Sequence, residues 1–417
     1  MNKKTKGAWI IHHSQKLKGV VGLLSEYEQI DFAGKCGLLL NALAGTQEIE
    51  VDNTRLYSLA KANGISTKLE LPSILSELER QRLIDRSMSG VAILGLTTKE
   101  TLEHTATIFE TAVPQENEDV ALELAEKASD LPMIREAATE YISDTLHVSS
   151  KDTSDIIDQC EQIGFVDTET IGDTKLLFNG NLFRHEEAAK INGVLSSLSS
   201  ADERTVIALS DKLQKNGCIS KSEAETLLGD VLYSKLHAIG FIDENTIGNE
   251  KGMFTFITRP SAFSKFTNSI TDDAFDLAKA LVTSLTYGIT TSPASRGRIT
   301  MIDALMRKLI GGSWVGPATA IGQDYKVLEL KGVIEVRPTG DKRFLMRLLK
   351  KDVGELALRV VTEGEASSTS LLDLPSVSAT KYYGPEKNRA ISRRKQSEPL
   401  KKGVPQLLSD LRTGGLR

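Results

Sequence analysis

The stretch Ile163-Gly-Phe-Val-Asp-Thr-Glu-Thr-Ile-Gly172 occurs a second time in the chain, as Ile239-Gly-Phe-Ile-Asp-Glu-Asn-Thr-Ile-Gly248. Seven of the ten positions are identical, and the two copies are 76 residues apart. Each copy is followed by an apolar run typical of a β-strand. Shorter versions occur at 83–85 and 333–335. The sequence therefore predicts four repeats, each of roughly 75 to 95 residues.

The same order of elements leads up to each copy. In repeat 1, helical periodicity predicts helices over 32–43, over 53–62 and after Thr67, with Asn53 and Thr67 as side-chain caps. A β-hairpin follows, with its first strand at Leu83. Each repeat is thus expected to contain three helices and then a hairpin.

Repeats 3 and 4 carry further signals of the same kind. Ser220 and Glu223 have the spacing of a capping box at a helix start in repeat 3. In repeat 4, Pro317 suits the first turn of a third helix that ends at Leu330. The hairpin turn of repeat 4 is expected at 338–341.

This order resembles that of the winged helix-turn-helix superfamily, and the resemblance is one of pattern. It implies a mainly α fold with small β-hairpin wings: four consecutive winged-helix units followed by a flexible basic C-terminal tail. The expected bounds are repeat 1 at 1–112, an acidic connector with repeat 2 at 113–190, repeat 3 at 191–268, the basic repeat 4 at 269–361, and a linker and tail at 362–417. The linker, 362–380, is rich in Ser and Thr and has few large apolar residues.

Composition narrows the class of protein. The chain has 417 residues, of which 40% are hydrophobic and 26% charged, as in ordinary globular domains. Its three cysteines are far apart, which argues against a disulfide framework and a cysteine-based zinc site and suits a reducing cytoplasm. The apolar runs are too short to span a bilayer, so no membrane partner and a cytoplasmic location are expected.

Charge is unevenly distributed along the chain. Residues 294–351 contain 12 Lys and Arg against 5 Asp and Glu, and residues 379–417 contain 10 against 3. Each segment has a net charge of +7, whereas the whole chain has −5, so the remainder carries −19. Segregation of this kind predicts separate roles for the basic and the acidic parts.

The resemblance implies where DNA would be contacted. In winged-helix proteins that bind DNA, the third helix enters the major groove and the wing meets the backbone. Phosphate contact requires Lys and Arg. The third helix of repeat 2 instead carries Asp152, Asp155, Asp158 and Glu161, so the acidic repeats 2 and 3 are expected to bind a protein partner or to self-associate.

Repeat 4 and the tail have the composition that phosphate contact needs. The competing interpretations are a solvated surface, an acidic protein partner for repeat 4, and a solubilising role for the tail. The expected DNA-binding residues are Arg296, Arg298, Arg307, Lys308, Lys326, Lys331, Arg337, Lys342, Arg343, Arg347, Arg393, Arg394 and Lys395.

The sequence contains no common catalytic or cofactor motif. It lacks phosphate-binding glycine loops, zinc-protease motifs and nucleophile elbows, so no enzyme, cofactor or metal is expected. The adjacent His12 and His13 point in different directions, which disfavours joint metal ligation. Trp9 and Trp314 are expected to pack, and an aromatic content of 5% argues against base stacking along single strands.

These observations predict a non-enzymatic protein that binds duplex DNA, as a transcriptional regulator or as an accessory factor in replication or defence. The alternative is a protein-interaction scaffold of tandem winged helices without direct DNA binding. A third class, an enzyme with an unrecognised site, lacks any supporting motif.

Overall fold

The computed structural model describes residues 1–17, 20, 23–44, 50–93, 98–183, 188–250, 252–266 and 272–368. The chain divides into two compact units. Among the described residues, the first comprises 1–128 and 133–170, and the second comprises 129–132 and 171–368. The expected tail residues Arg393, Arg394 and Lys395 lie outside the described residues.

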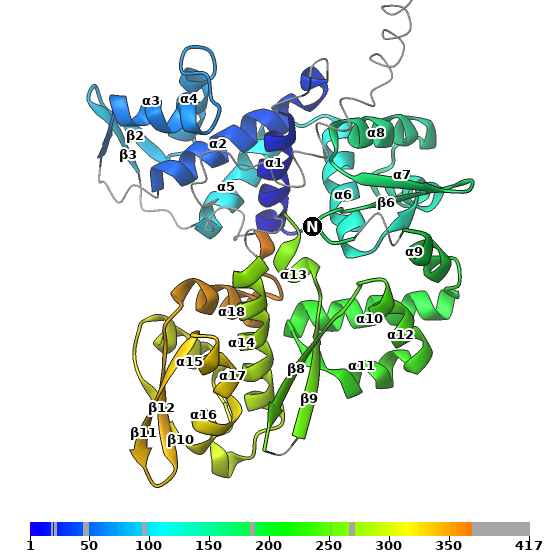
Figure 1. Cartoon of the computed structure of the whole chain (residues 1–417). Helices are drawn as coiled ribbons and strands as arrows, with labels where there is room; N and C mark the ends of the chain where they lie inside the picture. The colour runs from blue at the N-terminus through cyan, green and yellow to red at the C-terminus, as the bar shows by residue number, and fades with distance from the viewer. Residues whose placement is uncertain are drawn as a thin grey trace, which may run out of the picture. The chain divides into compact units, whose positions relative to one another are not determined.

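The first unit is mostly helical (Figure 1). Its elements are α1 (Lys3–Leu17), η1 (Leu24–Tyr27), α2 (Glu28–Ala44), β1 (Glu50–Asp52), α3 (Asn53–Ala62), α4 (Leu71–Arg80), β2 (Ile84–Arg86), β3 (Gly90–Ile93), α5 (Thr98–Thr111), α6 (Glu116–Asp130), β4 (Met133–Ile134), α7 (Arg135–Leu146), α8 (Ser150–Ile163) and β5 (Asp167–Ile171). The last two residues of α6, Ser129 and Asp130, belong to the second unit, as does the last residue of β5, Ile171. Helices α1, α2 and α5 pack closely on one another, and a Cβ at Gly7 would lie 2.0 Å from the Leu102 carbonyl oxygen.

The second unit contains the rest of the described chain. Its elements are β6 (Thr174–Phe178), α9 (Ala188–Leu195), α10 (Ser200–Asn216), β7 (Ile219–Ser220), α11 (Lys221–Leu228), α12 (Asp230–Ala238), β8 (Asp243–Asn249), β9 (Gly252–Thr258), α13 (Ser261–Ser264), α14 (Asp272–Thr290), η3 (Ala294–Arg296), α15 (Ile302–Ile310), β10 (Val315–Ala318), α16 (Thr319–Asp324), α17 (Lys326–Leu330), β11 (Ile334–Gly340), β12 (Arg343–Leu348) and α18 (Lys351–Glu363). None of the helices in the described ranges is long and apolar enough to cross a membrane.

The structure confirms a mainly helical chain with small β-sheets. Each repeat forms a three-stranded antiparallel sheet, with the orders β1-β3-β2, β4-β6-β5, β7-β9-β8 and β10-β12-β11. In every case the first strand precedes two helices and then lies beside the last strand. Sequence analysis predicted only the hairpin, because first strands of two to four residues are too short to show an alternating pattern.

The first strand also sets the start of the next helix. In repeat 1 the N-cap is Asp52, the last residue of β1, whose carboxylate accepts hydrogen bonds from the amides of Thr54 and Arg55. The predicted cap, Asn53, is the first helical residue instead. Ser220 ends β7 and caps α11 by accepting from the Glu223 amide, which is one half of the predicted capping box, and the Glu223 carboxylate pairs with Lys212. An extended strand residue already has the backbone conformation of an N-cap.

Two further predictions for helix starts are wrong. Helix α4 begins at Leu71 with Glu70 as its N-cap, so Thr67 does not cap it. Pro317 lies in β10 rather than in a helix, and two short helices, α16 from Thr319 and α17 from Lys326, replace the predicted third helix of repeat 4. Because β10 is an edge strand, it tolerates a residue that has no backbone N–H.

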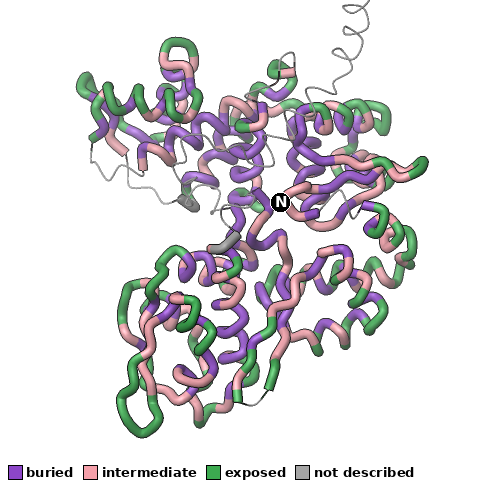
Figure 2. Tube along the Cα trace, viewed as in Figure 1, coloured by how far each residue is buried: buried purple, intermediate pink, exposed green. Residues whose placement is uncertain are grey.

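Helices α14 and α18 form the centre of the second unit (Figure 1). They share one core with residues of repeats 3 and 4. Figure 2 shows buried residues along both helices. The predicted linker start at Thr362 is wrong, since α18 continues to Glu363 and both Ser367 and Ser368 are fully buried. Ordered structure therefore extends through Ser368, and 369–380 lie outside the described residues.

Candidate nucleic-acid interface

One expected DNA-binding residue is used for internal structure. The Arg296 guanidinium donates to the Gln323 side-chain oxygen at 2.6 Å and to the Asp324 carboxylate at 2.9 Å. The Asp324 side chain is only 2% exposed. A buried carboxylate requires its cationic partner, so Arg296 anchors η3 to α16 rather than facing a ligand.

The basic residues around α15 and α17 are mostly exposed. Arg307 pairs with Asp303 at 2.8 Å, and Arg298 donates to the Ile289 carbonyl oxygen at 2.8 Å. Three lysines in this region are exposed and form no ion pair with a described residue: Lys308, Lys326 and Lys331. These lysines are available to an anionic partner.

The β11–β12 hairpin is the longest projection of repeat 4. Strand pairing runs from Ile334 opposite Leu348 to Gly340 opposite Arg343. Asp341 and Lys342 form the turn with φ of 50° and 57°, as in a two-residue type I′ turn. The turn is thus two residues later than the predicted 338–341, because the strands continue pairing as far as Gly340 and Arg343.

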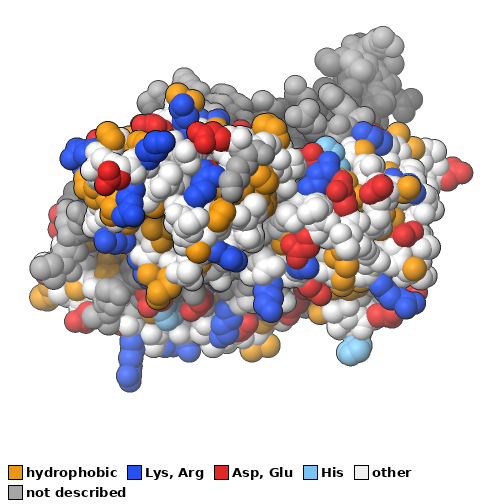
Figure 3. Space-filling model, turned by 90° about the horizontal axis from the view of Figure 1, so that it is seen from below, with side chains coloured by type: hydrophobic (Ala, Val, Ile, Leu, Met, Phe, Trp, Pro, Cys, Tyr) orange, Lys and Arg blue, Asp and Glu red, His pale blue; other side chains and the backbone are white. Residues whose placement is uncertain are grey.

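Two cations lie at the tip of this hairpin. Lys342 and Arg343 are both exposed, and no described residue forms an ion pair with either. The exposed tip is visible at the lower left of Figure 2. Figure 3 views the molecule from below, and on its left side, where repeat 4 lies, Lys and Arg are more frequent than Asp and Glu. The hairpin thus carries its charge where an extended polyanion can reach it.

Behind the tip, two arginines are held against a tryptophan. The guanidinium carbon of Arg337 lies 4.5 Å from the ring centroid of Trp314, and that of Arg347 lies 5.1 Å from it. Glu335 pairs with Arg347 at 2.6 Å and with Arg337 at 3.8 Å. Trp314 is partly exposed, whereas Trp9 is 1% exposed and belongs to the core. Sequence analysis assigned Trp314 to packing, because strand register was needed to bring these residues together.

The third helix of repeat 4 differs from the expected continuous one. Two short helices, α16 and α17, take its place with Tyr325 between them, and α17 has only five residues. On α17 the Leu330 side chain is 80% exposed and Val327 is 37% exposed. Lys326 and Lys331 flank them. This helix therefore presents a mixed apolar and basic surface.

Repeat 2 shows the acidic surface expected from the sequence. Asp152, Asp155 and Asp158 are exposed on α8. Asp158 pairs with Arg135 at 2.7 Å, which compensates one of these charges. The remaining carboxylates disfavour phosphate contact through this helix.

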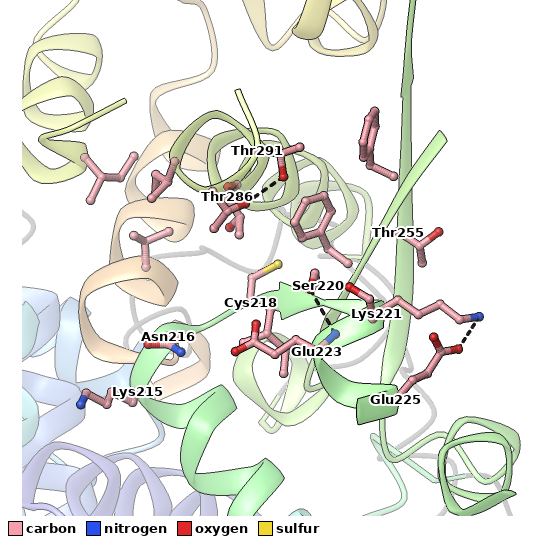
Figure 4. Close-up of a pocket in the computed structure, with 18 of the residues that line it drawn as sticks. Lys215, Asn216, Cys218, Ser220, Lys221, Glu223, Glu225, Thr255, Thr286 and Thr291 are labelled. Carbon is pink, nitrogen blue, oxygen red and sulfur yellow. Dashed lines mark hydrogen bonds and ion pairs between the residues drawn. The ribbon is translucent and has the colours of Figure 1, made fainter. Parts of the chain in front are cut away.

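A cleft of about 920 Å³ lies in the second unit among α11, β9 and the end of α14 (Figure 4). Several of its polar side chains are already bonded within the chain: Lys221 to Glu244 and Glu225, Ser220 to the α11 backbone, and Thr286 to a carbonyl of its own helix. Such a lining offers few free groups to fix a ligand, so the cleft is a weaker candidate site than the hairpin.

The histidine pair lies in the core of the first unit. His13 stacks on Phe165 with a centroid distance of 3.9 Å, and Trp9 lies 5.4 Å from His12. Burial lowers the pKa of both imidazoles well below their usual range. Across the described residues, no cluster of three potential metal ligands was found.

Comparison of the sequence with models of known protein families and with curated proteins finds no match.

Proposed function

We propose that the chain is a non-enzymatic protein that binds duplex DNA through the β11–β12 hairpin of repeat 4. The observation that carries this proposal is the pair Lys342 and Arg343, exposed and without a described ion-pair partner at the tip of a projecting hairpin. Arg337 and Arg347 continue the positive charge toward the base of the hairpin. Four cations on one narrow projection suit the phosphate backbone, which carries one negative charge per about 1.7 Å of duplex axis.

The order of the elements supports a winged-helix assignment for all four repeats. Each has a helix, a short strand, two helices and a hairpin, and each sheet places the short strand next to the last strand. A hairpin in this position is a wing in the sense of the superfamily that the sequence resembles. A regulatory, replicative or defence role would follow from DNA binding and needs its own experiment.

Within this proposal, the wing is the principal contact and the third helix is secondary. A five-residue helix with Leu330 largely exposed presents few groups to base edges or phosphates. Wing contacts to the backbone position a protein without reading sequence. We therefore expect modest discrimination between duplex sequences.

Fluorescence anisotropy with a labelled random duplex, measured for the full chain at several salt concentrations, tests the proposal. If about four to six phosphates are contacted, log K should fall with log salt at a slope of roughly −4 to −5. Absence of binding at about 50 mM salt would reject the DNA-binding proposal, since phosphate contacts are strongest at low salt.

A second candidate function, that of a protein-interaction adaptor, is favoured by α17. Leu330 and Val327 are large apolar side chains left in solvent, and Lys326 and Lys331 beside them suit an acidic partner. Repeat 2 of another copy has the required charge, since Asp152 and Asp155 are exposed on its helix α8. Sedimentation analysis of the chain without DNA tests this: Leu330→Ser should reduce self-association, and a chain that is monomeric throughout would exclude the second-copy version.

A further inference from the structure

The cluster around Trp314 lies on the outer face of the repeat 4 sheet. Val315 pairs with Met346, and both are buried, so their neighbours Trp314 and Arg347 point to the opposite face. Glu335 lies opposite Arg347 across β11 and β12. The three strands thus place an indole, a guanidinium and a carboxylate in one row, next to the hairpin that carries the tip cations.

The contacts within this row fix the indole while leaving part of it exposed. Both guanidinium groups lie within about 5 Å of the ring centroid, the range of cation–π attraction. Glu335 orients both arginines through its ion pairs. With two guanidiniums and one carboxylate the cluster keeps a net positive charge. A partly exposed aromatic ring beside positive charge has the chemistry that binds a nucleobase together with its phosphate.

We propose that Trp314, with Arg337 and Arg347, forms a binding site for one unpaired nucleobase next to the duplex held by the hairpin. The base stacks on the indole, and a guanidinium contacts the adjoining phosphate. This inference rests on the proposed DNA-binding function and narrows its substrate to duplexes with a single-stranded flank. Trp314 is the one tryptophan of repeat 4, and the proposed site has this single stacking position.

Intrinsic fluorescence gives a direct readout of this site. Trp9 is buried in the first unit and Trp314 is partly exposed, so quenching by DNA reports mainly on Trp314. The probes are a blunt duplex and the same duplex with a short single-stranded overhang. The overhang duplex should quench the fluorescence of the full chain and bind about tenfold more tightly than the blunt duplex. In a Trp314→Phe variant the DNA-dependent quenching should vanish. The phenyl ring can still stack on a base, so this variant should keep most of the preference for the overhang duplex over the blunt one.

A Trp314→Ala variant separates base binding from simple bracing of the hairpin. Base binding predicts that this variant loses the preference for the overhang, whatever smaller loss of affinity the released Arg337 and Arg347 cause for both probes alike. Equal weakening for both probes would overturn the site and assign Trp314 a structural role. If the wild-type chain binds both probes alike without quenching, this inference fails while the proposed function stands. If it binds neither probe, the proposed function fails as well.

Discussion

Neutralising the two cations at the hairpin tip should weaken duplex binding without unfolding the chain. The change is Lys342→Gln together with Arg343→Gln. Both side chains are exposed and lack an ion pair to described residues, so the free energy of unfolding should change by no more than about 0.5 kcal/mol per site. Arg347 is left unchanged because it is bound to Glu335 and Trp314.

The magnitude follows from counterion release. Each lost phosphate contact removes about 0.9 from the slope of log K against log salt, so two contacts remove about 1.8. Counterion release contributes nothing at about 1 M salt, and about 0.1 M salt is one decade lower. A slope change of about 1.8 over that decade corresponds to a loss of roughly 60-fold in affinity. Anisotropy titrations of wild type and variant at several salt concentrations measure both quantities.

A matched control removes the same charge from elsewhere in the second unit. Arg204→Gln with Lys215→Gln takes two exposed cations from α10 of repeat 3. This control should bind duplex nearly as well as wild type and keep its slope. If both double variants lose affinity equally, binding depends on net charge alone, and the assignment to the hairpin is refuted.

Three further predictions concern the stability of the first unit and the tail. Burial lowers the pKa of His12 and His13, so at low pH the unfolded chain binds more protons than the folded one. The free energy of unfolding should therefore fall as the pH drops below about 6.5, by up to about 2.7 kcal/mol per pH unit for the two histidines together. Urea unfolding at several pH values should show this loss, and His13→Phe should reduce it. Gly7→Ala should cost about 1–3 kcal/mol, since the new Cβ would lie 2.0 Å from a backbone oxygen of α5, whereas Gly193→Ala, with open space around it, should be neutral or slightly stabilising. A chain ending at Ser368 should stay folded. Because it lacks the basic tail, it should bind all duplexes more weakly than the full chain, and its log K should depend less steeply on log salt. Equal affinities of the two chains would assign the tail another role.

Repetition in the sequence made much of the fold predictable. The copies at 163–172 and 239–248 mark the helix end and hairpin of repeats 2 and 3, and helical periodicity located the helices before them. The short first strands were missed, because β4 and β7 have two residues each and become strands only through pairing with a distant partner. Local patterns carry no information about such pairing.

The site was less predictable than the fold. The sequence identified repeat 4 as basic but could not separate a structural cation from an available one. Arg296 pairs with a buried carboxylate, whereas Arg343 lies exposed beside the hairpin turn. Trp314 and Arg347 are far apart in sequence and meet only through the register of β10 and β12. Tertiary contacts decide these roles.

Hydrogen–deuterium exchange of the full chain, with and without a duplex at low salt, tests the central claim most directly, because it locates the contact. Amides of the β11–β12 hairpin, residues 334–348, should exchange more slowly when DNA is bound, and those of the acidic helix α8 should not change. Unchanged exchange in the hairpin, together with slowing in α8 or in repeat 1, would contradict the proposal that repeat 4 contacts DNA through its wing.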